Sequence, residues 1–435
     1  MTTMRKNRWL FVVLGTALVL AACGGEAEGP SPSIPASSTS SSSTVPTSAT
    51  PGVLAATEGV VRAEPAPAAP VAGLAAGFNE AGFALWRAQP PAGNLVFSPA
   101  SIGHALLMAR AAADEATGAA IDLALGLPAG AAAHQAWNAI DQSIARAVEA
   151  EDELTVAIAD RIWPRLDVRP DQAWVDLLTA EHGVTTQPLD LAGDPEGSRE
   201  VINAWVGEQT HGLIPQLLPA GFIHGRTVLV LTDALYFKAR WERVFGKYGP
   251  VPGDFTRLDG STVEVEFLQE LELADRRGRG DGFVGAEIPY VGPFSMLLIV
   301  PDEGRFAEVR DRLSQGLLDE IDAAFTTGPY ELLMPKWDDT TQLDLMGWLT
   351  EIGAAPGSYP GITPDAFLDA AVHAADITVD EWGTVAAAAT GFGFAESGPP
   401  EPELTVAADK PFLYLIRHRP SGLVLFAGQV TDPTA

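Results

Sequence analysis

Apolar residues repeat at helical spacing mainly in the first half of the chain. They recur every three or four positions in four segments, which are 78–88, 101–112, 200–210 and 306–321. One apolar stripe per segment is typical of an amphipathic helix that packs on a core. We therefore predict a helix in each of these segments.

Strand-like runs dominate the second half. Short apolar or alternating stretches occupy 153–163, 226–239, 294–301, 330–337, 369–381, 412–418 and 422–430. The last two flank Arg419-Pro420-Ser421-Gly422, which predicts a hairpin turn. Because helices and strands are interleaved in one core, the pattern predicts an α+β fold.

The segment from Asp380 to Glu403 fits none of these patterns. It begins with strand-like alternation, passes through four consecutive alanines, and ends in glycine, serine, proline and glutamate. Alanine favours helices, but the glycines and threonines crowded into this run oppose one. Counted in steps of two, one face carries Thr384, Ala386, Ala388, Thr390, Phe392 and Phe394. Small residues lead and large apolar ones follow, as entry into a closing gap between strands would require.

The amino terminus resembles a bacterial lipoprotein signal. Basic residues precede an apolar run over 9–22, which ends in Leu20-Ala21-Ala22 before Cys23. The run is too short to span a membrane, so residues 1–22 are predicted to be a signal peptide. Cys23 is then the lipidated first residue of an exported protein, anchored at the cell membrane or released. The alternative is an ordinary cleaved signal with an incidental cysteine.

Residues 23–70 are rich in serine, threonine, proline and alanine, which predicts a flexible tether. The folded domain is accordingly predicted over 71–435. Cys23 is the only cysteine of the chain. We therefore expect no disulfide, zinc site or cysteine nucleophile in the folded part.

Charge and motif content argue against several functions. The net charge is −29, with 56 acidic and 27 basic residues, which opposes nucleic-acid binding. No nucleophile elbow, metalloprotease motif, phosphate loop or calcium loop occurs, so no enzyme activity, metal or cofactor is predicted. His104, beside an apolar helix face, is interpreted as structural. Arg279-Gly280-Asp281 resembles an integrin ligand, but we interpret it as a solvated turn.

Four long segments resemble the serpin family in order and spacing. They are 94–106, 202–219, 231–245 and 406–430, and the likeness runs from about Val71 to Pro433. The resemblance implies one domain of three β-sheets and about nine helices. It also implies that Asp380 to Glu403 contains an exposed reactive loop. In serpins a protease cuts this loop, the freed part inserts into the main sheet, and the acylated protease is dragged along and distorted.

The resemblance also assigns roles to individual residues. The hinge of the loop is formed by Glu381, Gly383, Thr384, Ala386, Ala388 and Thr390. Insertion starts at the breach, where Lys336 pairs with Glu381 beside Trp241. The shutter, a central cluster that controls strand separation, comprises Asn94, Ser98, Pro99, Ser101, Asp233 and His373.

Three positions depart from the family pattern. Trp382 and Val385 each stand where a glutamate is usual, but Trp382 precedes the inserting stretch and Val385 is expected to point outward. Asp233 stands where asparagine is usual. We hypothesise that its carboxylate favours the charged form of His373 and locks the closed sheet with a charge-assisted bond.

The resulting prediction is a monomeric suicide inhibitor that forms a covalent complex with a serine protease, or alternatively a cysteine protease. The reactive bond is placed at Ser397-Gly398. No lysine or arginine lies between Glu381 and Asp409, so elastase-like or subtilisin-like targets are favoured over trypsin-like ones. The alternatives are a non-inhibitory serpin and a cell-surface binding protein that uses Arg279 to Asp281.

Overall fold

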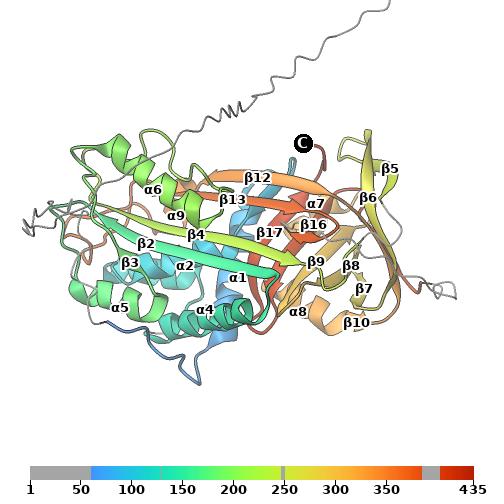
Figure 1. The fold of residues 1–435 in the computed structure, drawn as a ribbon, viewed down its shortest axis with the longest axis horizontal. Helices are drawn as coiled ribbons and strands as arrows, with labels where there is room; N and C mark the ends of the chain where they lie inside the picture. The colour runs from blue at the N-terminus through green and yellow to red at the C-terminus, as the bar shows by residue number, and fades with distance from the viewer. Residues whose placement is uncertain (1–59, 129, 246–249, 385–401) are drawn as a thin grey trace, which may run out of the picture. The chain divides into compact units, whose positions relative to one another are not determined.

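Three β-sheets organise the fold (Figure 1). The computed structural model describes residues 60–128, 130–245, 250–384 and 402–435, all within one compact unit of the chain. The six-stranded sheet has the order β12 (Trp337–Asp344), β13 (Val372–Val379), β14 (Gly383–Thr384), β4 (Leu229–Arg240), β2 (Leu154–Pro164) and β3 (Thr185–Thr186). Its longest pairing is the antiparallel ladder between β2 and β4, in which Asp160 lies opposite Asp233.

The other two sheets are built almost entirely from strands in the second half of the chain. The seven-stranded sheet has the order β1 (Leu95–Phe97), β17 (Leu423–Val430), β16 (Phe412–His418), β9 (Phe294–Pro301), β8 (Phe283–Pro289), β7 (Arg276–Gly280) and β10 (Thr326–Thr327). The four-stranded sheet has the order β15 (Thr405–Ala407), β11 (Tyr330–Pro335), β6 (Thr262–Leu273) and β5 (Val251–Thr256). β16 and β17 form the hairpin predicted from the sequence.

The described residues contain nine helices. They are α1 (Val71–Ala88), α2 (Pro99–Arg110), α3 (Glu115–Ala124), α4 (Ala132–Ala150), α5 (Gln172–His182), α6 (Pro195–Gln209), α7 (Phe306–Asp311), α8 (Gln315–Ala324) and α9 (Met346–Glu351). Local sequence explains several starts. Ser98 caps α2, with Pro99 as its first residue, and Asp114 caps α3. Such side chains accept hydrogen bonds from free N–H groups of the first turn.

Two apolar clusters cover opposite faces of the β2–β4 pair. The larger contains α1, α2, α4 and most of the seven-stranded sheet, together with Leu235 and Phe237 of β4. The smaller packs Ile202 and Val206 of α6 on Val230 of β4 and its neighbours. Side chains of a strand alternate between faces, so odd-numbered residues of β4, including Asp233, face the larger cluster.

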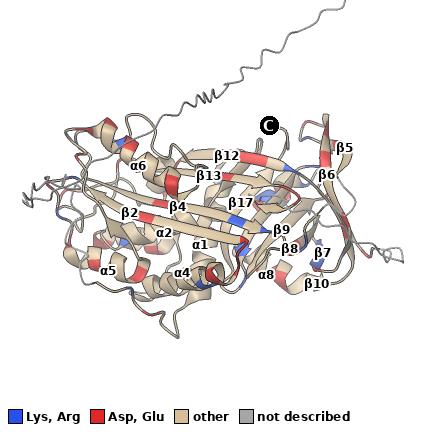
Figure 2. Cartoon of the chain, viewed as in Figure 1, with Lys and Arg blue, Asp and Glu red and all other residues tan. Residues whose placement is uncertain are grey.

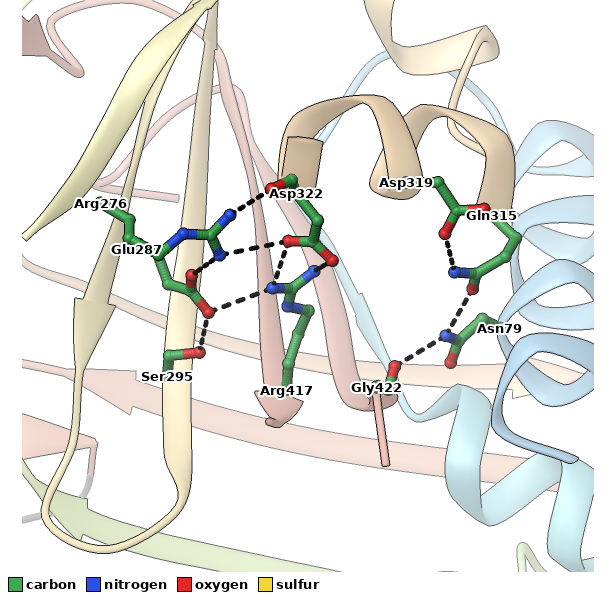
Figure 3. Close-up of polar contacts among 9 residues, drawn as sticks. All are labelled: Asn79, Arg276, Glu287, Ser295, Gln315, Asp319, Asp322, Arg417 and Gly422. Carbon is green, nitrogen blue, oxygen red and sulfur yellow. Dashed lines mark hydrogen bonds and ion pairs between the residues drawn. The ribbon is translucent and has the colours of Figure 1, made fainter. Parts of the chain in front are cut away.

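α8 is attached to the seven-stranded sheet by a polar cluster (Figure 3). Arg417 of β16 donates to Asp322 of α8 at 2.9 Å and to Glu287 of β8 at 3.1 Å. Arg276 and Ser295 also donate to Glu287, at 2.6 and 2.7 Å. Burial alone would raise the pKa of Glu287, but Arg417 and Ser295 overcome it and lower the pKa below its usual value. The buried carboxylate is thus fully paired.

Two predicted elements are each divided in the structure. The helix predicted over 306–321 is α7 followed by α8, because Ser314 accepts from the N–H of Leu317 and starts a new helix. The strand predicted over 330–337 ends at Pro335, and Trp337 begins β12 of a different sheet. Both corrections concern a break inside one continuous apolar pattern.

Part of the predicted tether packs on the folded domain. Arg62 donates to Asn138 at 2.8 Å and pairs with Asp141 at 2.5 Å, both on α4. The N–H of Ala63 donates to the carbonyl of Ala180 at 2.8 Å. Residues from Arg62 onward therefore belong to the domain, earlier than the predicted boundary at 71.

Acidic residues are spread over many elements, including α4, α5, α6 and β6, in the view of Figure 2. Their distribution agrees with the strongly negative net charge. Among the residues that the structure describes, no helix is long and apolar enough to cross a membrane.

Candidate functional site

The short strand β14 is the centre of the candidate site. Gly383 and Thr384 pair with Arg240 and Ala239 of β4, and Thr384 also pairs with Val379 of β13. Both pairings are antiparallel, so β13 and β4 run parallel to each other. Within the described residues, β13 and β4 are connected only through β14. The predicted hinge thus begins as a strand between two strands of the six-stranded sheet.

A tight turn delivers the chain from β13 into β14. Asp380 Oδ1 accepts from the N–H groups of Trp382 and Gly383, at 2.8 and 3.1 Å. The N–H of Trp241 donates to the carbonyl of Trp382 at 2.8 Å, and that of Phe245 to the carbonyl of Glu381 at 2.9 Å. An aspartate that binds the backbone two residues ahead is typical of such turns.

Gly383 is required by the close approach of β4. Its φ is +156°, and a Cβ at this position would collide with the carbonyl oxygen of Ala239 and with Cα of Arg240. Both obstacles are backbone atoms, so no side-chain rotation could relieve the contact. The family's hinge glycine therefore has a direct steric explanation here.

Thr384 points inward, as the alternation predicted. It is 2% exposed, and its Oγ1 lies 2.7 Å from the hydroxyl of Tyr290. The ring of Tyr290 stacks on Trp241 with centroids 4.2 Å apart. Burial raises the pKa of Tyr290 far above its usual value, so the phenol stays protonated. The first hinge threonine is therefore already packed in the core.

The predicted breach residues lie together beside this turn. Lys336 Nζ is 2.7 Å from Glu381 Oε2, and Trp241 Nε1 donates to the carbonyl of Asp380 at 2.9 Å. Burial would raise the pKa of Glu381, but its bond to Lys336 lowers the pKa overall. The pair is partly exposed, so its role is to hold the turn in place rather than to supply much stability.

Five of the six predicted shutter residues lie around the start of α2. The N–H of Ser98 donates to His373 Nε2 at 3.0 Å, while Ser98 Oγ accepts from the N–H of Ser101 at 3.0 Å. Ser101 Oγ donates in turn to Asp233 Oδ1. Pro99 occupies the first helical position between them. The cluster connects α2 to β13 on one side and to β4 on the other.

Asn94 does not belong to this cluster, contrary to the prediction. Its Nδ2 donates to the carbonyl of Asp432 at 2.8 Å, and its Oδ1 accepts from the N–H of Thr431 at 2.8 Å. Asn94 therefore fastens the end of β17 to the start of β1. The nearness of Asn94 and Ser98 in sequence does not bring their side chains together, because β1 separates them.

The hypothesis that Asp233 locks a charged His373 is wrong. Burial lowers the pKa of His373 to about 4, although the nearby charge of Asp233 opposes the change. The imidazole is thus neutral, and its Nε2 accepts from Ser98 instead of donating. Asp233 bonds to Ser101 and to His104, whose Nδ1 is 2.6 Å from Asp233 Oδ2.

His104 is fully buried and belongs to a row of histidines. Its Nε2 is 2.8 Å from Nδ1 of His182, whose Nε2 is 2.8 Å from Nδ1 of His134. Burial lowers the pKa of His134 to about 4 and that of His182 well below its usual value. Asp160 completes the cluster 3.5 Å from His104 Nδ1. Burial and the charge of Asp233 raise the pKa of Asp160 well above normal.

An apolar cavity adjoins the shutter. It has a volume of about 200 Å³ and is bounded by Ile102 and Leu106 of α2, Leu229 and Leu231 of β4, and Leu345. Asp233 and His373 lie at its polar end. The cavity therefore lies where β4 and β13 begin, at the opposite end of these strands from β14.

Several predicted residues lie outside the described part of the chain. They are Cys23, Val385, Ala386, Ala388, Thr390, Ser397 and Gly398. The Arg279–Asp281 tripeptide is described, and its Asp281 pairs with Arg305 at 2.8 Å and with Arg312 at 3.3 Å. An integrin-type ligand needs this carboxylate for its receptor, so these contacts do not favour the adhesin alternative.

Sequence reasoning missed four residues of the site and its surroundings. Asp380 could have been identified, since an aspartate before Trp-Gly after a strand signals a turn. Tyr290, Asp160 and His182 could not, because each is far in sequence from its partners.

Comparisons with known proteins give the same fold. The family model described as Serpin (serine protease inhibitor) matches residues 81–433. Serpin-Z2A of Oryza sativa subsp. japonica is 30% identical over 409 residues, which cover 79% of this chain and 92% of that protein. The leukocyte elastase inhibitor of Bos taurus is 29% identical over 368 residues, which cover 79% of this chain and 94% of that protein.

Solved structures are similar across nearly their whole length. The native state of tengpin, a thermophilic serpin, has a TM-score of 0.75 at 21% identity and covers 86% of this chain and 96% of that chain. Thyroxine-binding globulin in complex with thyroxine has a TM-score of 0.72 at 23% identity, covering 83% and 99%. At these identities the likeness concerns the fold. Together with the family match over most of its length, it shows that the chain belongs to the serpin family.

Proposed function

We propose that this chain is a suicide inhibitor of serine proteases that works by inserting its cut reactive loop into the six-stranded sheet. The supporting observation is the position of β14. The hinge residues Gly383 and Thr384 already occupy a strand position between β13 and β4, antiparallel to both. The following residues need only continue in the same direction to form a full central strand.

Extending the register of β14 gives a consistent partner for each inward residue. One step along the loop is one step back along β4 and β13, so Thr390 would lie between Asp233 and His373. Its hydroxyl can donate to the carboxylate, and its oxygen can accept from a ring N–H. Insertion would therefore place a side chain of matching chemistry, Thr390, between the two shutter residues.

The same register brings the two loop phenylalanines to the apolar cavity. Phe392 would pair with Leu231 and Phe394 with Leu229, and both leucines border the cavity of about 200 Å³. Burying two phenylalanines contributes on the order of 3–6 kcal/mol. The strand hydrogen bonds add to this stabilisation. The uncut form is therefore kinetically trapped in a state less stable than the inserted form.

The proposed target class follows from the sequence of the loop. Ser397-Gly398 is the proposed reactive bond, and no basic residue lies between Glu381 and Asp409. A protease with a shallow apolar pocket, such as an elastase or a subtilisin, fits this sequence. One relative carries the name leukocyte elastase inhibitor, which agrees with the same class.

Incubation with purified proteases tests the proposal. We expect a complex stable in denaturing electrophoresis with elastase or subtilisin, and none with trypsin. Mass spectrometry of the released carboxyl peptide should show Gly398 as its first residue. Cleavage without a stable complex for every protease would instead favour a non-inhibitory serpin. That alternative is represented in this fold by thyroxine-binding globulin, whose structure holds thyroxine.

A second proposal concerns the location of the protein. We infer from Leu20 to Cys23 that the mature chain begins at a lipidated Cys23 and is exported to the membrane surface. The parent should fractionate with membranes, whereas Cys23→Ala should be released or remain unprocessed. Equal solubility and identical processing of the two would contradict the anchor.

A further inference from the structure

Two aspartates face each other across the β2–β4 ladder. Asp160 and Asp233 are direct cross-strand partners, and their side chains are only 5% and 3% exposed. Like charges placed directly opposite in a sheet are destabilising, and a buried carboxylate needs a positive partner. Among the described residues, no arginine or lysine forms an ion pair with either one. The pair therefore requires a proton or a cation.

His104 of α2 supplies a third ligand to the same point. Its Nδ1 lies 2.6 Å from Asp233 Oδ2 and 3.5 Å from Asp160 Oδ2. One ligand atom from each of the three residues lies within 4.8 Å of the other two. Oδ1 of Asp160 is buried and has no hydrogen-bond partner within the described residues. One nitrogen and two carboxylates thus converge, with a carboxylate oxygen still unused.

The histidines behind His104 are arranged to support a metal ligand. With a cation on Nδ1, His104 carries its proton on Nε2 and donates to His182, which donates to His134 in turn. Metal-binding histidines usually donate their second N–H to such a partner, which fixes their orientation. Stacking on Trp137 at 3.8 Å also holds the His104 ring.

We propose that His104, Asp160 and Asp233 bind one Zn²⁺ ion beneath the six-stranded sheet. An imidazole with two carboxylates suits this ion, whereas Ca²⁺ and Mg²⁺ take oxygen ligands. The ion would replace the direct bond between His104 and Asp233, and water or Ser101 Oγ would take the fourth position. The sequence-based expectation of no zinc site rested on missing cysteines and took no account of these residues.

Zn²⁺ binding has a structural consequence, and the cavity offers the ion a path to its site. The ion neutralises the two opposed carboxylates and connects α2 to β2 and β4. The cavity beside the shutter is bordered by both Ser101 and Asp233, so an ion that enters the cavity can reach the site. A ligand that binds only the folded state raises its stability.

Zinc titration of the metal-stripped full-length protein tests the proposal. We expect one Zn²⁺ per chain by competition with a chromogenic chelator, a higher thermal midpoint, and d–d absorption of a tetrahedral site with Co²⁺. Asp160→Asn should weaken Zn²⁺ binding at least about 100-fold and abolish the Co²⁺ spectrum. Without metal this variant should unfold at or above the parent's temperature, because the neutral amide cannot repel the carboxylate of Asp233.

A matched control is the exposed pair of His224 and Asp369, 3.0 Å apart. His224→Gln removes a histidine next to one aspartate and should leave zinc affinity unchanged. His104→Gln is a second test of the site if Asp160→Asn does not fold. Absence of stoichiometric binding by the parent, or unchanged affinity in Asp160→Asn or His104→Gln, would overturn the proposal. Proteolysis assays are not involved, so the inhibitor proposal stands or fails separately.

Discussion

At the scale of single residues, His373 makes the closed sheet sensitive to acid. The folded-state pKa of about 4 lies below the ordinary 6.5, so between these values the unfolded chain binds a proton that the folded chain does not. Stability therefore rises as pH increases from about 4 to 6.5, and falls as the solution is acidified. This sign is opposite to that of a charged His373 lock.

We predict that His373→Gln loses less stability than the parent between pH 7 and pH 4. The lowered pKa of His373 corresponds to about 3 kcal/mol in the free energy of unfolding. Urea unfolding of parent and variant at pH 7 and at pH 4 measures how much of this free energy each one loses. His224→Gln, which removes an exposed histidine, is the control and should retain the full acid loss. Parallel pH profiles for parent and His373→Gln would show that this imidazole is not responsible.

At the scale of elements, β14 decides how a hinge substitution acts. Thr384 is already buried against Tyr290 in the uncut protein. An arginine there must expel β14 from the sheet or bury an unpaired charge, which costs several kcal/mol. Either result should hinder the proposed insertion after the loop is cut.

Thr384→Arg should therefore be cleaved at a normal rate but form at least about tenfold less covalent complex, an effect of about 1.4 kcal/mol or more on the competing steps. Denaturing electrophoresis separates the two products. Thr384→Ser keeps the hydroxyl that contacts Tyr290 and should inhibit as the parent does. A full yield of complex from Thr384→Arg would contradict insertion through β14.

At the scale of the whole molecule, cleavage of the loop should stabilise the fold. The register of β14 places Phe392 and Phe394 at the cavity bordered by Leu229 and Leu231. We predict that cutting near Ser397 raises the thermal midpoint sharply. In the double variant Phe392→Ala and Phe394→Ala this rise should be smaller, since each buried Phe→Ala change costs about 3–5 kcal/mol.

Calorimetry of cut and uncut protein measures the rise. Leu123→Ala, on α3 at 85% exposure, truncates a large apolar side chain that has no such role. It should leave the rise intact. An unchanged rise in the double phenylalanine variant would mean that these side chains do not enter the cavity.

The sequence by itself determined the kinds of elements, the family and the inward orientation of Thr384. These features depend on local patterns, namely apolar spacing, the Ser98-Pro99 helix start and the alternation of small residues. It also brought together Lys336, Glu381 and Trp241 correctly through the family resemblance. Breaks inside a continuous pattern, such as Ser314 between α7 and α8, were less visible because apolar periodicity continues across them.

Only the tertiary structure decided which polar groups meet in the core. The register of β2 against β4 sets Asp160 opposite Asp233, and the packing of α2 brings His104 to both. Asp233 therefore bonds to His104 and does not hold His373 in its charged form. Asn94 accepts a hydrogen bond from the backbone just after β17. Such contacts join residues more than 50 positions apart, and their distances depend on strand register and helix packing, which no local pattern contains.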